Sequence, residues 1–174
     1  MVILRDAQFS DHAAIAKLHA ANWQQYYRGI LSDHYLDNEV GQDRFDVWYK
    51  RLSSPAANQQ VTVAVFNNEI VGFAGLFLDD DPFFGSLLDN LHVSTQLQKT
   101  GIGKLLMQDC AKNVRDRADI KKMYLWAYES NVNARKVYEH LEGVCYETVE
   151  SRGEDGVNKR VCRYTWNDFS PLFR

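Results

Sequence analysis

Hydrophobic and polar residues alternate along the first 52 residues in a way that predicts one short strand and two helices. The strand covers residues 2–5 and leads to Ser10, which we expect to be a helix N-cap because its hydroxyl can accept a free backbone N–H. The helix that follows ends near Gly29 and has apolar side chains at helical spacing at Ala14, Ile15 and Leu18. A second helix is predicted over residues 42–52.

The middle of the chain predicts a β-hairpin, a further strand and an amphipathic helix. Two apolar runs at 61–66 and 70–78 flank Asn67 and Asn68, a pair that tolerates positive φ in a tight turn. Another strand at 86–93 is followed by a glycine-containing loop that opens a helix. One face of that helix carries Ile102, Leu105, Leu106, Cys110 and Val114.

The last third predicts a buried strand at 123–128, a helix at 131–141 and two terminal strands at 144–149 and 160–166. Helices interleaved among strands, with hairpins at both ends, indicate an α/β (α+β) fold around one central sheet. No repeat or low-complexity linker divides the sequence, so we expect residues 1–174 to form a single domain.

The composition narrows the class of protein. Of 174 residues, 45% are hydrophobic and 25% charged, which is enough to bury one sizeable core. The formal net charge of −3 disfavours nucleic acid as a partner. The longest apolar stretch, 70–78, is far shorter than the roughly 20 residues of a membrane helix, so no membrane association is expected.

The termini and the cysteines favour a cytoplasmic protein. The N-terminus lacks the apolar length and small-residue cleavage site of a secretory signal. Cys110, Cys145 and Cys162 are an odd number without metal-binding or disulfide spacing, so we interpret them as packing residues in a reducing compartment. The five histidines show no metal spacing either, and no metal is expected.

The loop between the 86–93 strand and the next helix has the features of an anion site. Gln98-x-x-Gly101-x-Gly103 places free backbone N–H groups and a helix N-terminus together, and glycine lets the backbone approach phosphate oxygens. Lys99 and Lys104 add positive charge. A glycine turn that merely starts a helix is the alternative.

Other phosphate-binding motifs fit less well. A Walker loop needs Ser or Thr after Gly-Lys, but Leu105 stands there. A dinucleotide fingerprint needs Gly or Ala where Leu106 stands, and it remains a weak alternative.

Two motifs resemble those of the GNAT superfamily of N-acetyltransferases. The stretch from Leu91 to Gly103 matches the family's Q/R-x-x-G-x-G/A signature after a strand, and Asn131 to Tyr138 is similar to its later N-x-x-A-x-x-x-Y motif. His19, Trp23 and Tyr27 also resemble the start of a bacterial branch, so the resemblance covers nearly the whole chain.

The resemblance implies a mixed sheet of about seven strands flanked by about four helices, in which the fourth and fifth strands, 86–93 and 123–128, splay apart. Backbone groups of Leu91, His92 and Val93 are then expected to pair with the pantetheine of acetyl-CoA. Asn131 and Ala134 come from the second motif and are expected to contact the cofactor from the other side. The N–H groups that would hold the pyrophosphate belong to Gln98, Lys99, Thr100, Gly101, Ile102, Gly103 and Lys104.

The implied activity is transfer of an acetyl group from acetyl-CoA to an amine of a small molecule or peptide, by direct attack in a ternary complex. A homodimer is possible, because homodimers are common among relatives. The alternative function is a CoA-binding sensor without turnover. Leu87 favours this alternative, because many family members have a carboxylate there.

The resemblance makes Tyr138 the candidate general acid, with a core tyrosine as the alternative because Ala134, Val137 and Leu141 share its helical face. A lysine-like amine is almost fully protonated at pH 7, so a base or a water chain is expected. Asp89 acting through water is the favoured base, with His92, Glu129 or merely solvated side chains as alternatives. Strand alternation predicts that Asp89 shares a face with Leu87 and Leu91, and Asn90 a face with His92.

Two further groups are candidates for an acidic and aromatic lip that receives a cationic amine. They are Asp79–Asp81 with Phe83 and Phe84, and Trp23 with Tyr26 and Tyr27. A solvated loop and helix packing explain them equally well.

Overall fold

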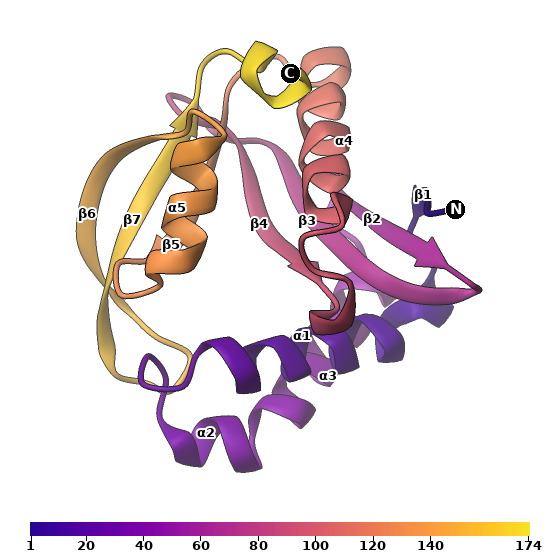
Figure 1. Cartoon of the computed structure of the whole chain (residues 1–174), viewed down its shortest axis with the longest axis vertical. Coiled ribbons are helices and arrows are strands. Elements are labelled where there is room, and N and C mark those ends of the chain that lie inside the picture. Colours follow the sequence, from indigo (N-terminus) through magenta and orange to yellow (C-terminus); the bar gives the residue numbers. More distant parts are fainter.

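Seven strands form one mixed sheet in the computed structural model, which describes all 174 residues (Figure 1). Its strands, in the order in which they lie in the sheet, are β1 (Ile3–Asp6), β2 (Gln59–Phe66), β3 (Glu69–Asp81), β4 (Gly85–Val93), β5 (Met123–Tyr128), β7 (Asn158–Trp166) and β6 (Val144–Arg152). Its α-helices are α1 (His12–Tyr26), α2 (Asp33–Asn38), α3 (Val40–Ser53), α4 (Ile102–Arg117) and α5 (Val132–His140). The predicted α/β class and seven strands are confirmed.

Local sequence signals explain most of these boundaries. Asn67 and Asn68 have φ values of 50° and 64°, so they form the predicted tight turn between β2 and β3. Asn131 caps α5 by accepting a hydrogen bond from Ala134 N at 3.3 Å. Ser32 caps α2 in the same way through Tyr35 N. Helix α2 was not predicted, although Ser32 and Asp33 carry its start signal.

The start of α1 differs from the prediction. Ser10 is not an N-cap, because it lies inside a 3₁₀ helix at Phe9–Asp11 that precedes α1. The side chain that fixes this turn is Asp11, whose carboxylate accepts the Gln8 N–H at 2.7 Å and binds Arg5. A tertiary partner on β1 therefore decides the turn, which the local pattern does not show.

Helices cover both faces of the β2–β4 half of the sheet. Trp48 of α3 and Ile15 of α1 pack with Val63 and Phe73 on one face. Leu106 of α4 and its apolar neighbours pack on the other face and belong to a core that continues onto β5 and β7. Helix α5 lies beside β5 and β7, so α4 and α5 stand on either side of the sheet's centre (Figure 1).

The two halves of the sheet meet along very few residues. Strands β4 and β5 are parallel and pair only at Ser86 with Met123 and Leu87 with Tyr124. Beyond these pairs β4 continues to Val93 and β5 to Tyr128 without pairing to each other, and the strands diverge (Figure 1). The predicted splay of the fourth and fifth strands is confirmed.

Two of the three cysteines are packing residues as predicted. Cys110 and Cys162 are buried in the core, but Cys145 is exposed on β6, so the prediction is wrong for that residue. None of the helices combines the length and the apolar character that crossing a membrane requires.

Candidate active site

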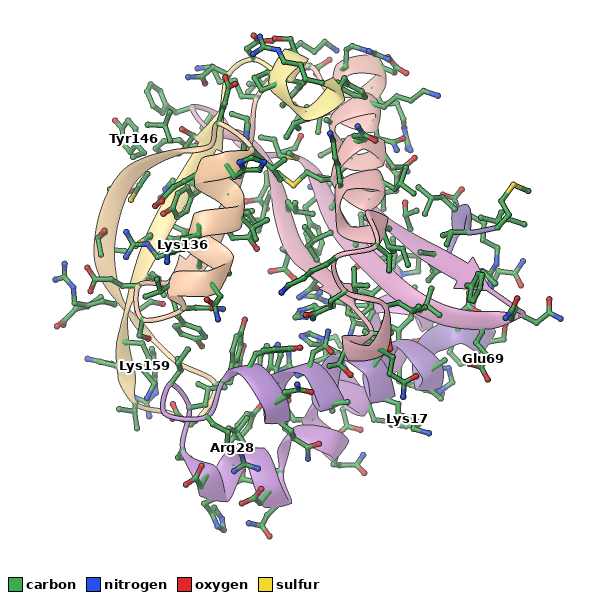
Figure 2. All side chains as sticks on the ribbon, viewed as in Figure 1. Lys17, Arg28, Glu69, Lys136, Tyr146 and Lys159 are labelled. Atoms are coloured by element: carbon green, nitrogen blue, oxygen red, sulfur yellow. The ribbon has the colours of Figure 1, made fainter.

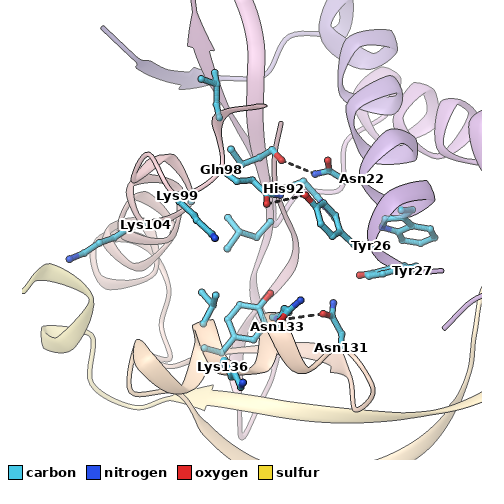
Figure 3. Close-up of a pocket in the computed structure, with 18 of the residues that line it drawn as sticks. Asn22, Tyr26, Tyr27, His92, Gln98, Lys99, Lys104, Asn131, Asn133 and Lys136 are labelled. Atoms are coloured by element: carbon cyan, nitrogen blue, oxygen red, sulfur yellow. Dashed lines mark hydrogen bonds between the residues drawn. The ribbon is translucent and has the colours of Figure 1, made fainter. Parts of the chain in front are cut away.

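A cleft of about 750 Å³ opens where β4 and β5 diverge (Figure 3). Its walls come from α1, the end of β4, the glycine loop, the start of α4, and α5. These segments are far apart in the sequence, and the splayed sheet brings them together.

The glycine loop presents a continuous row of unused backbone donors. No backbone N–H from Gln98 to Lys104 donates to the protein, and the first bond of α4 is Leu105 N to Gly101 O at 3.0 Å. Lys99 and Gly101 have φ values of 62° and 90°, which turn successive N–H groups toward one side. The row therefore forms an anion site at the N-terminus of a 16-residue helix.

The two glycines of this loop leave space beside the backbone. A Cβ atom at Gly101 would meet nothing within 4 Å, and one at Gly103 would meet only Val93 Cγ2, at 3.7 Å. Both residues line the cleft. The space is thus left for a ligand rather than filled by the protein.

The two lysines of the loop have different surroundings. Lys99 points into the cleft, whereas Lys104 points away from it (Figure 3) and donates its ammonium to the backbone carbonyl of Arg174. The expectation that both side chains add charge at the loop is therefore met by Lys99 alone.

One edge of β4 is free along the cleft. Ser94 N donates to Val71 O at 2.7 Å and His92 faces Phe73, so the alternation of the antiparallel ladder turns the backbone groups of Leu91 and Val93 away from β3. Asn22 Nδ2 donates to Val93 O at 3.0 Å. The remaining groups of this edge are available to an extended ligand.

Helix α5 supplies the facing wall. The Asn131 carbonyl oxygen caps the helix, while its amide nitrogen has no protein partner. Tyr138 packs its ring against Tyr164 and Trp166, yet it lines the cleft and its hydroxyl makes no hydrogen bond to the protein. Burial raises the pKa of Tyr138 to about 12, so the phenol keeps its proton at neutral pH.

Most of the predicted cofactor-binding residues line this cleft. They are Leu91, His92, Val93, Gln98, Lys99, Gly101, Gly103, Lys104, Asn131 and Ala134. Thr100 and Ile102 do not line the cleft, because the Thr100 hydroxyl donates to Leu97 O at 2.5 Å and the Ile102 side chain is buried in the core.

The structure places Asp89 outside the lining of the cleft. A β-bulge between Asn90 and Leu88 gives β4 one extra residue, and Arg51 Nη1 contacts both Asp89 Oδ2 and Asn90 Oδ1 at 2.7 Å. The predicted alternation is therefore wrong for Asp89, because the bulge puts Asp89 and Asn90 against the same side chain.

The alternative base candidates also lie in defined surroundings. Glu129 is ion-paired with Arg160 at 2.6 Å and does not line the cleft. His92 does line it, with its ring 4.4 Å from that of His19 between centroids. Burial, with a contribution from Arg44, lowers the pKa of His92 to about 3, so the imidazole is neutral at physiological pH.

The predicted acidic and aromatic lip is divided by the fold. Trp23, Tyr26 and Tyr27 line the cleft, and Tyr26 Oη donates to Gln98 Oε1 at 3.0 Å. Asp79 instead accepts the backbone N–H groups at 119 and 120, and Asp81 those at 83 and 84. The carboxylates of Asp79 and Asp81 are therefore bound by the protein's own backbone and do not line the cleft.

Several of the residues that line the cleft were not assigned to a cofactor site from the sequence, above all those of α1. Asn22 with Tyr26 and Trp23 with Tyr27 are spaced four apart, so each pair lies on one helical face. That spacing is a sequence signal for a shared surface, but it does not say what faces it. The other missed residues are Leu97, Asn133, Lys136 and Val137.

Comparisons with known proteins agree with this architecture. The sequence model of the Acetyltransferase (GNAT) family matches residues 15–143. An uncharacterized N-acetyltransferase of Bacillus subtilis (strain 168), YuaI, is 25% identical over 132 residues, which are 75% of this chain and 74% of that protein.

Solved structures share the fold at low sequence identity. PaiA N-acetyltransferase from Thermoplasma acidophilum, in complex with coenzyme A, has a TM-score of 0.69 and 13% identity, over 95% of this chain and 99% of that one. YncA from Salmonella typhimurium, with its cofactor acetyl-CoA, has a TM-score of 0.68 and 16% identity, over 97% and 95%.

Proposed function

The chain belongs to the acetyltransferase (GNAT) family, and from this premise we propose that it transfers the acetyl group of acetyl-CoA to a primary amine by direct attack in a ternary complex. The observation that carries the proposal is the row of unused N–H groups from Gln98 to Lys104 beside the free edge of β4. A diphosphate and an extended amide-containing chain match these two features in charge and in hydrogen bonding.

Specific residues fit the cofactor. The loop N–H groups would hold the pyrophosphate, with Lys99 contributing charge from the same side. Backbone groups of Leu91 and Val93 would pair with the pantetheine, and the free amide nitrogen of Asn131 faces them across the cleft. Two structures with the same fold contain coenzyme A or acetyl-CoA, which supports this assignment.

Bound acetyl-CoA supplies an activated acyl group, and the chain's own residues handle the charges that develop. The free N–H groups at the end of β4 would donate to the carbonyl oxygen as it becomes negative. The amine nitrogen forms the new C–N bond, the C–S bond breaks, and the nitrogen loses a proton while the sulfur gains one.

We assign Tyr138 a role in stabilising the sulfur that leaves as acetyl-CoA is cleaved. Full proton transfer from a phenol with a pKa of about 12 to a thiolate with an ordinary pKa near 8.5 is uphill by about 5 kcal/mol. We therefore assign the Tyr138 hydroxyl a hydrogen bond to the departing thiolate, and the proton that the sulfur finally gains comes from the amine.

Two measurements test the proposal together. Acetyl-CoA should raise the melting temperature, by an amount corresponding to about 2.7 kcal/mol at a hundredfold excess over Kd, while NAD should not. Addition of a suitable primary amine should then release free thiol. Equal stabilisation by NAD would contradict the assignment of the loop.

A CoA-binding module without turnover is the second candidate function. The observation that favours it is the absence of any Asp or Glu among the residues that line the cleft. Cofactor binding without thiol release, across amines of widely different basicity, would establish this function in place of catalysis.

A further inference from the structure

The end of the cleft nearest α1 is built from aromatic side chains. Tyr27 directs its hydroxyl into the cleft (Figure 3), makes no hydrogen bond to the protein and packs edge-on against Tyr128 at 5.3 Å. Trp23 packs beside it in a tilted arrangement, at 5.2 Å between ring centroids. Burial first, and then the Tyr138 phenol, raise the pKa of Tyr27 above its ordinary range.

No carboxylate reaches this end of the cleft. The charged residues that line the cleft are Lys99, Lys104 and Lys136, all basic. Carboxylates on the elements around the cleft are paired with cations of the protein. These pairs include Asp89 with Arg51 at 2.7 Å, Glu129 with Arg160 at 2.6 Å, Asp43 with Arg44 at 2.9 Å, Glu154 with Arg44 at 3.9 Å and Asp155 with Lys159 at 3.1 Å.

The same region disfavours a positive charge. His92 lines the cleft and is held neutral by burial and by Arg44, and His19 behind it is fully buried and neutral. The Arg44 guanidinium lies 4.4 Å from the centre of the Trp23 ring, so the protein's own cation already occupies that aromatic face. An ammonium ion entering here would lose its hydration and gain no counter-ion.

We propose that the acceptor's amine enters the cleft uncharged, against the wall formed by Trp23 and Tyr27. This inference rests on the proposed acetyl transfer. The preferred acceptor is therefore a weakly basic primary amine on an apolar body, such as the α-amino group of a peptide or amino-acid amide with an aromatic side chain. The ammonium form of the acceptor gives its extra proton to water before the acceptor binds. The proton that the amine nitrogen loses during C–N bond formation passes to the departing sulfur.

The expected selectivity follows from the neutral fraction of each amine. At pH 7.5 about one third of an α-amino group with a pKa near 7.8 is uncharged, against about one in 800 for a lysine side chain with a pKa near 10.4. The form that such a site accepts is thus about 250-fold more abundant for the α-amine than for the lysine side chain.

The test compares phenylalaninamide with Nα-acetyl-lysinamide as acceptors, with thiol release as the readout. We expect kcat/KM at pH 7.5 to be at least about 100-fold higher for phenylalaninamide. Between pH 6 and 9.5, kcat/KM should level off near pH 8 for phenylalaninamide and keep rising about tenfold per pH unit for the lysine compound. Equal rates, or a faster lysine compound, at pH 7.5 would overturn the inference.

Three variants test whether the aromatic wall or a general base at Asp89 determines which amine is accepted. Tyr27→Leu should raise KM for phenylalaninamide at least about fivefold and leave the Kd of acetyl-CoA unchanged. Tyr49→Leu, at a position 49% exposed on α3 outside the cleft, is the control and should change neither. Asp89→Asn should keep kcat/KM within about twofold, whereas a loss of more than about tenfold would restore Asp89 as the base and overturn the inference.

The outcomes also separate this inference from the function on which it rests. Thiol release with the lysine compound alone overturns the acceptor class and leaves acetyl transfer standing. Binding of acetyl-CoA without release to either amine overturns both.

Discussion

Gly101 and Gly103 serve the same loop for different reasons. Gly101 adopts a φ of 90°, which residues with side chains rarely adopt, and it is the N-cap residue just before α4. Gly103 is helical and needs no special φ, but it lines the cleft at the point where the helix N–H groups are free. The first glycine is therefore required by conformation and the second by access.

Replacing Gly103 tests the anion site directly. Gly103→Glu places a bulky negative side chain where phosphate is expected, so acetyl-CoA affinity should fall at least about 100-fold, as measured by calorimetry. Gly41→Glu on α3 is the matched control, because a Cβ there meets nothing within 4 Å and Gly41 lies outside the cleft. Unchanged affinity in Gly103→Glu would contradict the role of the loop.

Tyr138 combines a packed ring with a free hydroxyl, which allows a clean test of its chemistry. Tyr138→Phe keeps the contacts with Tyr164 and Trp166, so acetyl-CoA affinity should persist while kcat falls about 10- to 100-fold. Tyr146→Phe, exposed on β6 (Figure 2), should change neither quantity. An unaltered kcat in Tyr138→Phe would leave Tyr138 with a packing role alone.

Contacts between elements hold the acceptor end of the cleft in place. The β6–β7 hairpin reaches the α1–α2 connection, where Asp155 accepts the Ser32 N–H at 2.8 Å and pairs with Lys159. Figure 2 shows Lys159 close to the connection that carries Arg28. Burial alone would raise the pKa of Asp155, but the N–H groups of Ser32 and Val157 and the Lys159 ammonium outweigh it and hold the pKa low.

This contact predicts a pH-dependent contribution to stability. Because the folded-state pKa of Asp155 is lowered, its carboxylate stabilises the fold above the unfolded value near 3.9, and the contribution is lost as pH falls through the folded pKa. Asp155→Asn should lower the free energy of unfolding by about 1–3 kcal/mol at pH 7, and the difference should shrink below about pH 4. Urea denaturation at both pH values measures it, with the exposed Asp46→Asn as the control.

The junction between α5 and β6 depends on a close approach to β7. A Cβ atom at Gly143 would lie 2.4 Å from Trp166 Cζ2, and Trp166 Nε1 donates to Leu141 O at 2.9 Å. Gly143→Ala should therefore reduce the free energy of unfolding by about 1–3 kcal/mol in urea. Gly41→Ala, at an open helical position, should instead increase it by about 0.5–1 kcal/mol, and equal effects would contradict the steric explanation.

The sheet has two halves whose strands pair with each other only at the start of β4 and β5. Each half contributes one wall of the cleft, so a ligand in it contacts both halves. Hydrogen exchange should accordingly show that acetyl-CoA protects backbone amides at 91–104 and also slows exchange in α5, while β1 and β2 stay unchanged. Protection confined to one half would contradict binding between the splayed strands.

The sequence by itself determined the elements and the loop. Periodicity, the Asn67–Asn68 turn, the Asn131 cap and the glycine spacing are local properties, fixed by neighbouring residues along the chain. They were enough to predict the α/β class, and the resemblance carried by the two motifs added the splayed strands. The boundaries that failed, at Ser10 and α2, depended on a side chain from another element or on a helix of only six residues.

Only the tertiary structure decided what surrounds each side chain. The bulge that joins Asp89 and Asn90 to Arg51, the aromatic wall that α1 contributes to the cleft and the ion pair of Glu129 with Arg160 arise between residues tens of positions apart. The glycine loop was visible in the sequence as an anion site because its residues are neighbours along the chain. Hydrogen bonding and burial act through space, so the charge and basicity of the acceptor amine became an inference only after folding placed the two walls of the cleft together.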